Sequence, residues 1–219
     1  MLSSKITKKE NYFIEANGYK MQKRTLIPSN EQYQSVIKEL TDKNLFRALI
    51  ALRMGAEMGM TRIEIVNARL NDLDRYHNRG LWVEIAKKVR RGNKMVDGVK
   101  TPVFQARSRE IPMNSSLYAL VKGFASKSPV YILYREKGDL MKSLQTRNLN
   151  TLYENAHVPW STHKSRHYYK NRVLDWMRTN KQVDFELLSD LLGHKKTQTM
   201  QYGNISWDYK QKTIDEVFK

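Results

Sequence analysis

The sequence predicts a mostly helical fold with one small antiparallel β-sheet, which places the chain in the α+β class. Apolar residues recur at helical spacing in most segments after residue 27. Two segments near the middle of the chain instead alternate apolar and polar residues, and a basic loop with glycine joins them. With 219 residues and 40% hydrophobic residues, the chain is long enough to bury a core within one large domain.

Several of the predicted helices begin or end at residues that commonly cap helices. Pro28-Ser29-Asn30-Glu31 predicts the start of the first helix, with Ser29 or Asn30 as the cap. Gly59 interrupts the second helical pattern, and Thr61 can cap the third. Gly193 follows a short amphipathic segment at the position of a C-terminal cap. The eight predicted helices cover about residues 30–40, 44–54, 62–69, 116–124, 145–154, 164–178, 185–192 and 207–218.

The middle of the chain predicts a basic β-hairpin. Leu81–Ile85 alternates apolar and polar residues, and so does Val103–Ala106, which leads to Ile111-Pro112. Between the two segments, residues 87–94 have the sequence KKVRRGNK, and Gly98 follows. Two strands joined through a glycine-bearing loop are typical of a hairpin, so we expect lysine and arginine to be concentrated on it.

The charge of the chain favours a polyanionic partner. The sequence has 39 Lys and Arg against 22 Asp and Glu, and its net charge is +17. A chain this basic most often binds nucleic acid. The chain has no cysteine, which excludes disulfides, thiolate zinc sites and cysteine nucleophiles. The sequence also lacks a membrane-spanning apolar run and a signal-peptide core, so we expect a cytoplasmic protein that faces nucleic acid.

The strongest functional signal lies in the C-terminal third of the chain. His163, Arg166 and His167 form an H-x-x-R-H pattern, and Leu191-Leu192-Gly193-His194 follows. Arginine binds phosphate oxygens in a bidentate manner, and imidazoles exchange protons near neutral pH. Tyr202 follows His194 by eight residues and is a candidate nucleophile. Together these residue types suit chemistry on a phosphodiester.

These motifs, in this order, resemble those of the tyrosine recombinase family, which includes phage integrases and Xer-type resolvases. The family's first box, roughly G-x-R-x-S-E-L, is similar to Gly59–Ile65, and Leu70–Asp74 follows it as LNDLD. Its H-x-L-R-H box is similar to His163–His167, and its L-G-H box to Leu192–His194. The resemblance covers about residues 28–210 and implies a mostly helical catalytic domain with a small three-stranded sheet.

The resemblance implies a role for each matching residue. Arg62 and Arg166 would clamp the scissile phosphate and stabilise the charge of the transition state. His163 would assist proton transfer from the tyrosine, and His194 would donate a hydrogen bond to a phosphate oxygen. Tyr202 would attack phosphorus to form a 3′-phosphotyrosyl bond and release a 5′-hydroxyl. Double-stranded DNA is the implied partner, and no metal or ATP is required.

A lysine of the hairpin would protonate the leaving oxygen. Lys88 fits the family's strand-then-lysine pattern best, and Lys94 and Lys87 are the alternatives. Glu64 and His167 are further candidates for a catalytic or supporting role. The family places its carboxylate three residues after the first arginine, whereas Glu64 lies two residues after Arg62.

The nucleophile has an alternative, because the family's usual step from histidine to tyrosine is nine residues and here it is eight. If Tyr202 is not the nucleophile, Tyr209 is the next candidate. His167 also has a structural interpretation, as a buried histidine bonded to the backbone.

The predicted organisation has three parts. Residues 1–27 are a polar, basic arm or linker remnant, residues 28–206 are the catalytic domain, and residues 207–219 are a tail helix. The tail docks either on its own domain or on a neighbouring subunit, and the resemblance implies a tetramer on DNA. The family commonly carries a further N-terminal helical domain, which residues 1–27 are too short to supply.

The sequence is also compatible with two other functions. A type IB topoisomerase would use the same chemistry without strand exchange. A DNA-binding protein would keep the fold without the reaction, with residues 184–192 and Lys195-Lys196 as part of a helix-turn-helix. Against simple binding, the sequence keeps Tyr202 together with both arginines.

Overall fold

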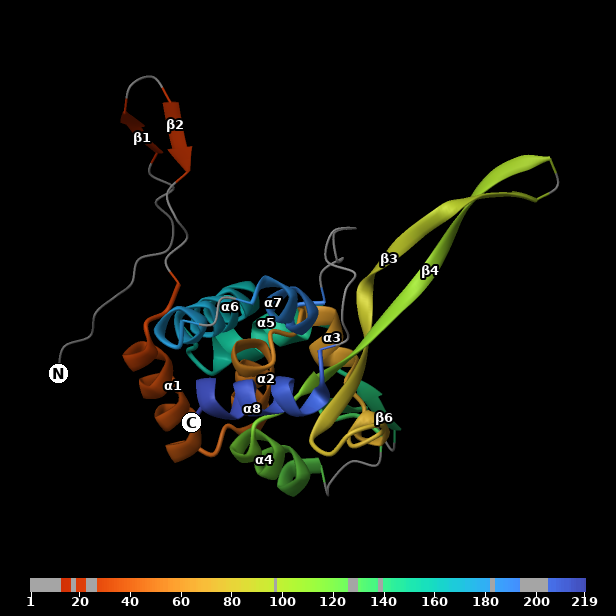
Figure 1. Ribbon diagram of the computed structural model, residues 1–219. Coiled ribbons are helices and arrows are strands. Elements are labelled where there is room, and N and C mark those ends of the chain that lie inside the picture. Colours follow the sequence, from red (N-terminus) through yellow and green to blue (C-terminus); the bar gives the residue numbers. More distant parts are fainter. Residues whose placement is uncertain are drawn as a thin grey trace.

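The computed structural model describes residues 13–16, 19–22, 27–96, 98–125, 130–137, 140–181, 184–193 and 205–219. Its helices pack into one body, from which a long two-stranded hairpin projects (Figure 1). The helices are α1 (Asn30–Asp42), α2 (Phe46–Glu57), α3 (Arg62–Asn67), α4 (Ser115–Ala125), α5 (Thr146–Asn155), α6 (Thr162–Thr179), α7 (Phe185–Leu191) and α8 (Trp207–Val217), with the short 3-10 helix η1 (Leu70–Asp72). The strands are β1 (Phe13–Ala16), β2 (Tyr19–Gln22), β3 (Gly80–Val96), β4 (Val99–Pro112), β5 (Tyr134–Lys137) and β6 (Leu140–Ser143).

The predicted fold class is confirmed, since each of the eight predicted helices and the basic hairpin is present. β3 pairs with β4 in an antiparallel register that runs from Gly80–Pro112 to Val96–Val99. The described strands pair only in twos, although an isolated bridge between Leu73 and Leu81 lies beside the hairpin. Among the described residues, the three-stranded sheet that the resemblance implies is therefore present only as a hairpin with a neighbouring bridge.

Two short hairpins were not predicted. β1 pairs with β2 inside the segment expected to be an arm, and β5 pairs with β6 between α4 and α5. Each strand has only four residues, which is too short for alternation to stand out in the sequence.

The predicted caps at Ser29 and Thr61 are confirmed. Ser29 caps α1 through a capping box with Gln32, and Thr61 caps α3 through one with Glu64. The Oδ1 atom of Asn114 accepts a hydrogen bond from the Leu117 amide at 2.9 Å, which caps α4. Helix α3 is shorter than predicted, because the backbone becomes extended at Ala68.

The core has two parts. The larger part surrounds α2, which lies in the middle of the helical body (Figure 1). Ile50, Leu52 and Met54 of this helix are fully buried. The smaller part lies where α6, α7 and α8 meet, and its buried residues include Val173 and Ile214. Burial of these apolar faces is the main source of stability for helices this short.

The tail helix α8 packs on its own chain in this structure. Arg79 donates two hydrogen bonds to Asp215, both at 2.9 Å, and Gln211 donates one to the carbonyl of Met113 at 2.9 Å. The ring of Trp207 stacks on His77 with centroids 4.5 Å apart. Docking of the tail on a neighbouring subunit stays a prediction.

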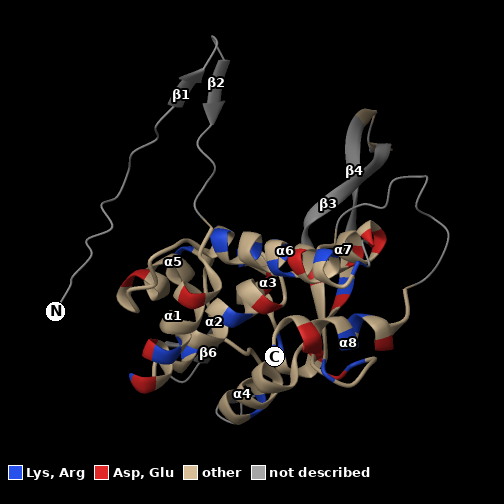
Figure 2. Cartoon of the chain, turned by 60° about the vertical axis from the view of Figure 1, so that its left-hand side comes forward, with Lys and Arg blue, Asp and Glu red and all other residues tan. Residues whose placement is uncertain are grey.

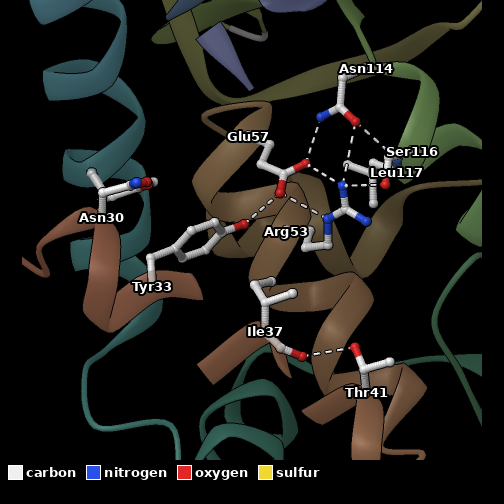
Figure 3. A network of polar contacts seen from close by, with 10 residues as sticks. Asn30, Tyr33, Ile37, Thr41, Arg53, Glu57, Asn114, Ser116 and Leu117 are labelled. Carbon is white, nitrogen blue, oxygen red and sulfur yellow. Dashed lines mark hydrogen bonds and ion pairs between the residues drawn. The ribbon is translucent and has the colours of Figure 1, made fainter. Parts of the chain in front are cut away.

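A buried polar network joins α1, α2 and the start of α4 (Figure 3). The carboxylate of Glu57 accepts hydrogen bonds from Tyr33 Oη at 2.6 Å and Asn114 Nδ2 at 2.6 Å. Arg53 adds two more, from Nε at 2.8 Å and from Nη2 at 2.9 Å. Because four short bonds satisfy one carboxylate, the buried charge is well compensated.

None of the helices in the described ranges is long and apolar enough to cross a membrane.

Candidate active site

Arg62, His163 and Arg166 line one pocket of about 400 Å³. Three hydroxyl-bearing residues, Thr61, Thr146 and Thr162, also line it. Thr146 is the first residue of α5, and Thr162 is the first residue of α6. Amide groups at the start of a helix carry partial positive charge, so two helix starts and two arginines favour an anion in this pocket.

The loop before α3 sets the position of Arg62. Gly59 has a φ of +62°, which lets the chain turn sharply after α2. Thr61 then caps α3, so Arg62 is the first residue of that helix. A Cβ atom at Gly59 would lie 2.6 Å from the Tyr169 ring, so the loop also lies against α6.

The guanidinium of Arg166 is fixed by backbone groups from two other segments. It donates to the carbonyl of Gly59, and its Nη2 atom donates to the carbonyl of Leu192 at 2.7 Å. Burial lowers the pKa of Arg166, and nearby Arg109 lowers it further, while Glu64 opposes the shift. An arginine nevertheless stays protonated in proteins, so Arg166 presents a fixed cation at the pocket.

Glu64 is buried beside Arg166 and serves three neighbours. Its Oε2 atom accepts a hydrogen bond from the Thr61 amide at 2.6 Å, which completes the α3 cap. The same carboxylate is 3.4 Å from Arg109, through both Nε and Nη2, and 3.9 Å from Arg166 Nη1. The two-residue offset from Arg62 therefore leaves Glu64 in contact with the second candidate arginine.

Arg109 was not predicted as a site residue. It lies near the end of β4, and it also donates to the carbonyl of Leu191 at the end of α7. Its only signal in the sequence is an arginine two residues before Ile111-Pro112, where the hairpin returns to the core. Nothing in that local pattern indicates which carboxylate the arginine meets.

His163 and His167 form a pair one turn apart on α6. Their Nε2 atoms are 3.0 Å apart, so one ring donates and the other accepts. The pKa of His167 is lowered by burial and then by the nearby charges of His163, Lys170 and Arg166. His163 is exposed and lines the pocket, whereas His167 is half-buried and is not among the lining residues.

The remaining predicted residues are only partly described. Lys87, Lys88 and Lys94 lie in β3, and the pairing with β4 is irregular between Ile85 and Val89, around the first two lysines. Such irregularities redirect side chains, but the side chains of these lysines lie outside the described part of the structure. His194 and Tyr202 also lie outside the described residues.

The alternative nucleophile, Tyr209, lies in α8. Its amide donates to Ser206 at the helix start, and its ring packs against the smaller core. Burial raises the pKa of Tyr209, which disfavours the phenolate.

Basic residues recur along α6, which bears the histidine pair (Figure 2). The helix has one acidic residue, Asp175, and five basic ones: Lys164, Arg166, Lys170, Arg172 and Arg178. Within the described ranges, no three His, Asp or Glu side chains are grouped so that they could hold a metal ion.

No protein-family model matches the sequence, and no curated protein matches it. The structure, in contrast, is similar to several solved structures. It matches the XerA recombinase with a TM-score of 0.55 and 14% identity, over 89% of this chain and 66% of that one. It matches the integrase from mycobacterium phage Brujita with a TM-score of 0.59 and 14% identity, over 92% and 62%.

A third similar structure is a lambda integrase dimer bound to a COC′ core site. The TM-score is 0.51 and the identity 15%, over 86% of this chain and 64% of that one. The chain thus spans somewhat under two thirds of the length of these three solved structures. Its fold is that of the tyrosine recombinase catalytic domain.

Proposed function

We propose that this chain cleaves and rejoins double-stranded DNA through a 3′-phosphotyrosyl intermediate, as a site-specific recombinase or integrase. The observation that carries the proposal is the pocket that brings Arg62, His163 and Arg166 together from two separate helices. Its cationic lining suits a phosphodiester. The net charge of +17 and the fold support the same function. The protein would act on DNA in the cytoplasm.

The proposed step is a transesterification at phosphorus. The phenolic oxygen of Tyr202 attacks the scissile phosphate while the bond between phosphorus and the 5′ oxygen breaks. His163 accepts the tyrosine proton, and a hairpin lysine, Lys88 in our assignment, donates a proton to the leaving oxygen. Arg62, Arg166 and His194 stabilise the charge on the other phosphate oxygens. One ester bond replaces another, so rejoining needs no ATP.

The nucleophile can be tested with a nicked suicide DNA duplex and a denaturing gel. We expect the native chain to form a covalent adduct, and Tyr202→Phe to bind the duplex without forming one. Tyr209→Phe is the matched control, because it removes the same oxygen from a nearby tyrosine. An adduct that persists in Tyr202→Phe and disappears in Tyr209→Phe would move the nucleophile to α8.

The source of positive charge can be tested by removing free metal ions. Because arginines and a lysine supply the charge in this proposal, cleavage in excess EDTA should proceed at the rate seen with Mg²⁺. A strict requirement for Mg²⁺ would contradict the mechanism.

Assembly through the tail can be tested by holding α8 on its own chain. The chain has no cysteine, so Arg79→Cys and Asp215→Cys can be joined by a short thiol crosslinker. If α8 docks on a neighbouring subunit, the crosslinked protein should cleave one site but lose cooperative assembly and strand exchange. The same variant without crosslinker is the control. Equal strand exchange by both forms would show that α8 only completes its own core.

A further inference from the structure

We propose that Arg109 is a positioning residue of the cleavage reaction, which holds Arg166 at the scissile phosphate through Glu64 and the end of α7. This inference rests on the proposed function. Arg109 is not among the residues that line the pocket, so its effect would pass through its two partners. Near the end of β4, Arg109 contacts Glu64 of α3 and the carbonyl of Leu191 at the end of α7.

The first contact divides one negative charge between two cations. The Glu64 carboxylate is 3.4 Å from Arg109 and 3.9 Å from Arg166, and the Glu64 side chain is buried. Charges that are shielded from water interact strongly, so the carboxylate attracts both guanidiniums. Without Arg109, Glu64 would draw Arg166 toward itself and compete with a phosphate for the same donors.

The second contact involves the end of α7. Arg109 donates to the carbonyl of Leu191, and Arg166 donates to the carbonyl of Leu192. The last carbonyls of a helix have no partner within it and carry partial negative charge. Two guanidiniums therefore hold two consecutive carbonyls, just before Gly193 and the predicted phosphate ligand His194.

Arg109 thereby ties together the segments that carry the candidate residues. It belongs to the hairpin that also carries Lys88. Its carboxylate partner, Glu64, lies in α3, which begins at Arg62, and its carbonyl partner, Leu191, precedes His194 by three residues. A shift of about 1 Å in a reacting group can slow catalysis about 100-fold. Removal of Arg109 should therefore slow cleavage without weakening the binding of DNA.

The experiment compares three variants with the native chain for single-turnover cleavage of the suicide duplex and for DNA affinity. We expect Arg109→Gln to slow cleavage about 100-fold with little change in Kd. Arg109→Lys keeps the charge but not the forked geometry, so its loss should be smaller. In the double variant Glu64→Gln with Arg109→Gln, the carboxylate that would draw Arg166 away from the phosphate is also removed. We therefore expect its cleavage rate to be about tenfold higher than that of Arg109→Gln.

Two controls separate positioning from a general effect on folding or charge. Arg53→Gln breaks a similarly buried Arg–Glu pair, the one between Arg53 and Glu57. It should destabilise the chain, but the molecules that stay folded should cleave at the native rate. Arg178→Gln removes one exposed charge on α6 and should match the native chain.

The outcomes are distinguishable. An adduct in the native chain with unchanged cleavage by Arg109→Gln would overturn this inference and leave the proposed function standing. Arg109 would be only a structural residue under two conditions. The cleavage rate of Arg109→Gln would fall in proportion to its unfolded fraction, and adding Glu64→Gln would not restore it. If Arg109→Gln does not fold, Arg109→Lys and the double variant decide. Failure of the native chain to form any adduct would instead contradict the proposed function.

Discussion

Two buried glutamates, Glu57 and Glu64, both pair with arginine, but the first pairs at short distance and the second at long distance. Glu57 receives four bonds between 2.6 and 2.9 Å, from Tyr33, Arg53 and Asn114. Glu64 accepts one short hydrogen bond, from the amide of the cap residue Thr61, and lies 3.4 Å from Arg109 and 3.9 Å from Arg166. The difference is that the first carboxylate is saturated by its neighbours, whereas the second holds its cations loosely.

Burial does not explain the contrast. In the Arg53–Glu57 pair the side chains are 11% and 6% exposed, and in the Arg109–Glu64 pair they are 8% and 1% exposed. A tight, saturated pair fixes helices to one another and contributes to the fold. A loose pair beside a pocket leaves Arg166 able to bind a ligand anion as well. Geometry, rather than burial, therefore separates the structural pair from the candidate functional one.

The largest effect on stability should come from breaking the saturated network. Arg53→Gln leaves Glu57 buried with a reduced set of partners, and we expect a loss of about 3–5 kcal/mol in the free energy of unfolding. Urea denaturation followed by circular dichroism measures it. A loss below about 1 kcal/mol would mean that the network is not a main support of the fold.

Arg109→Gln should have a smaller effect on stability, although it has the larger effect on cleavage. Glu64 keeps Arg166 and the Thr61 amide as partners, so we expect a loss of about 2 kcal/mol by the same denaturation. A loss equal to that of Arg53→Gln would remove the distinction between the two pairs.

Tyr33→Phe sharpens the comparison by removing one bond from the saturated carboxylate. The Glu57 charge keeps Arg53 and Asn114, so the expected loss is about 1.5 kcal/mol. Asn114 offers no such clean test, because its side chain also caps α4. A neutral Tyr33→Phe would show that the carboxylate is satisfied without the tyrosine.

A further effect should appear only at alkaline pH. Burial raises the pKa of Tyr33 well above its usual value, and the Glu57 charge raises it further. The folded chain then keeps a proton that the unfolded chain releases, so this contribution to stability is complete below about pH 10 and is lost as pH rises further. Above pH 10, native stability should fall more steeply than that of Tyr33→Phe, by up to about 1.4 kcal/mol per pH unit. Parallel curves would contradict the assignment.

Local signals were sufficient for most of the fold. Caps at Ser29 and Thr61 and helical spacing of apolar residues act within a few neighbouring positions, so the sequence alone predicts them. The short hairpins β1–β2 and β5–β6 could not be predicted, since four-residue strands contain too few alternations. The docking of α8 depends on residues such as Arg79, more than a hundred positions earlier in the chain, which no local pattern specifies.

In the candidate site too, local motifs predict some residues, whereas others depend on contacts between distant segments. The H-x-x-R-H pattern predicts His163 and Arg166 as site residues, and the structure places both at the pocket with Arg62. Arg109 could not be predicted, because its partners Glu64 and Leu191 come from two distant segments. The roles of Lys88, His194 and Tyr202 stay predictions.

Gly59 shapes the loop before α3, and it also limits which residues position 59 can accept. Its positive φ, the Tyr169 ring 2.6 Å from where a Cβ would lie, and its carbonyl bond to Arg166 all act on one residue. In a saturation library selected for DNA cleavage, position 59 should keep glycine alone. At Gly123 a Cβ would meet nothing within 4 Å, so that position should accept many residues. Laboratory evolution of new target specificity would therefore have to proceed around position 59 rather than through it.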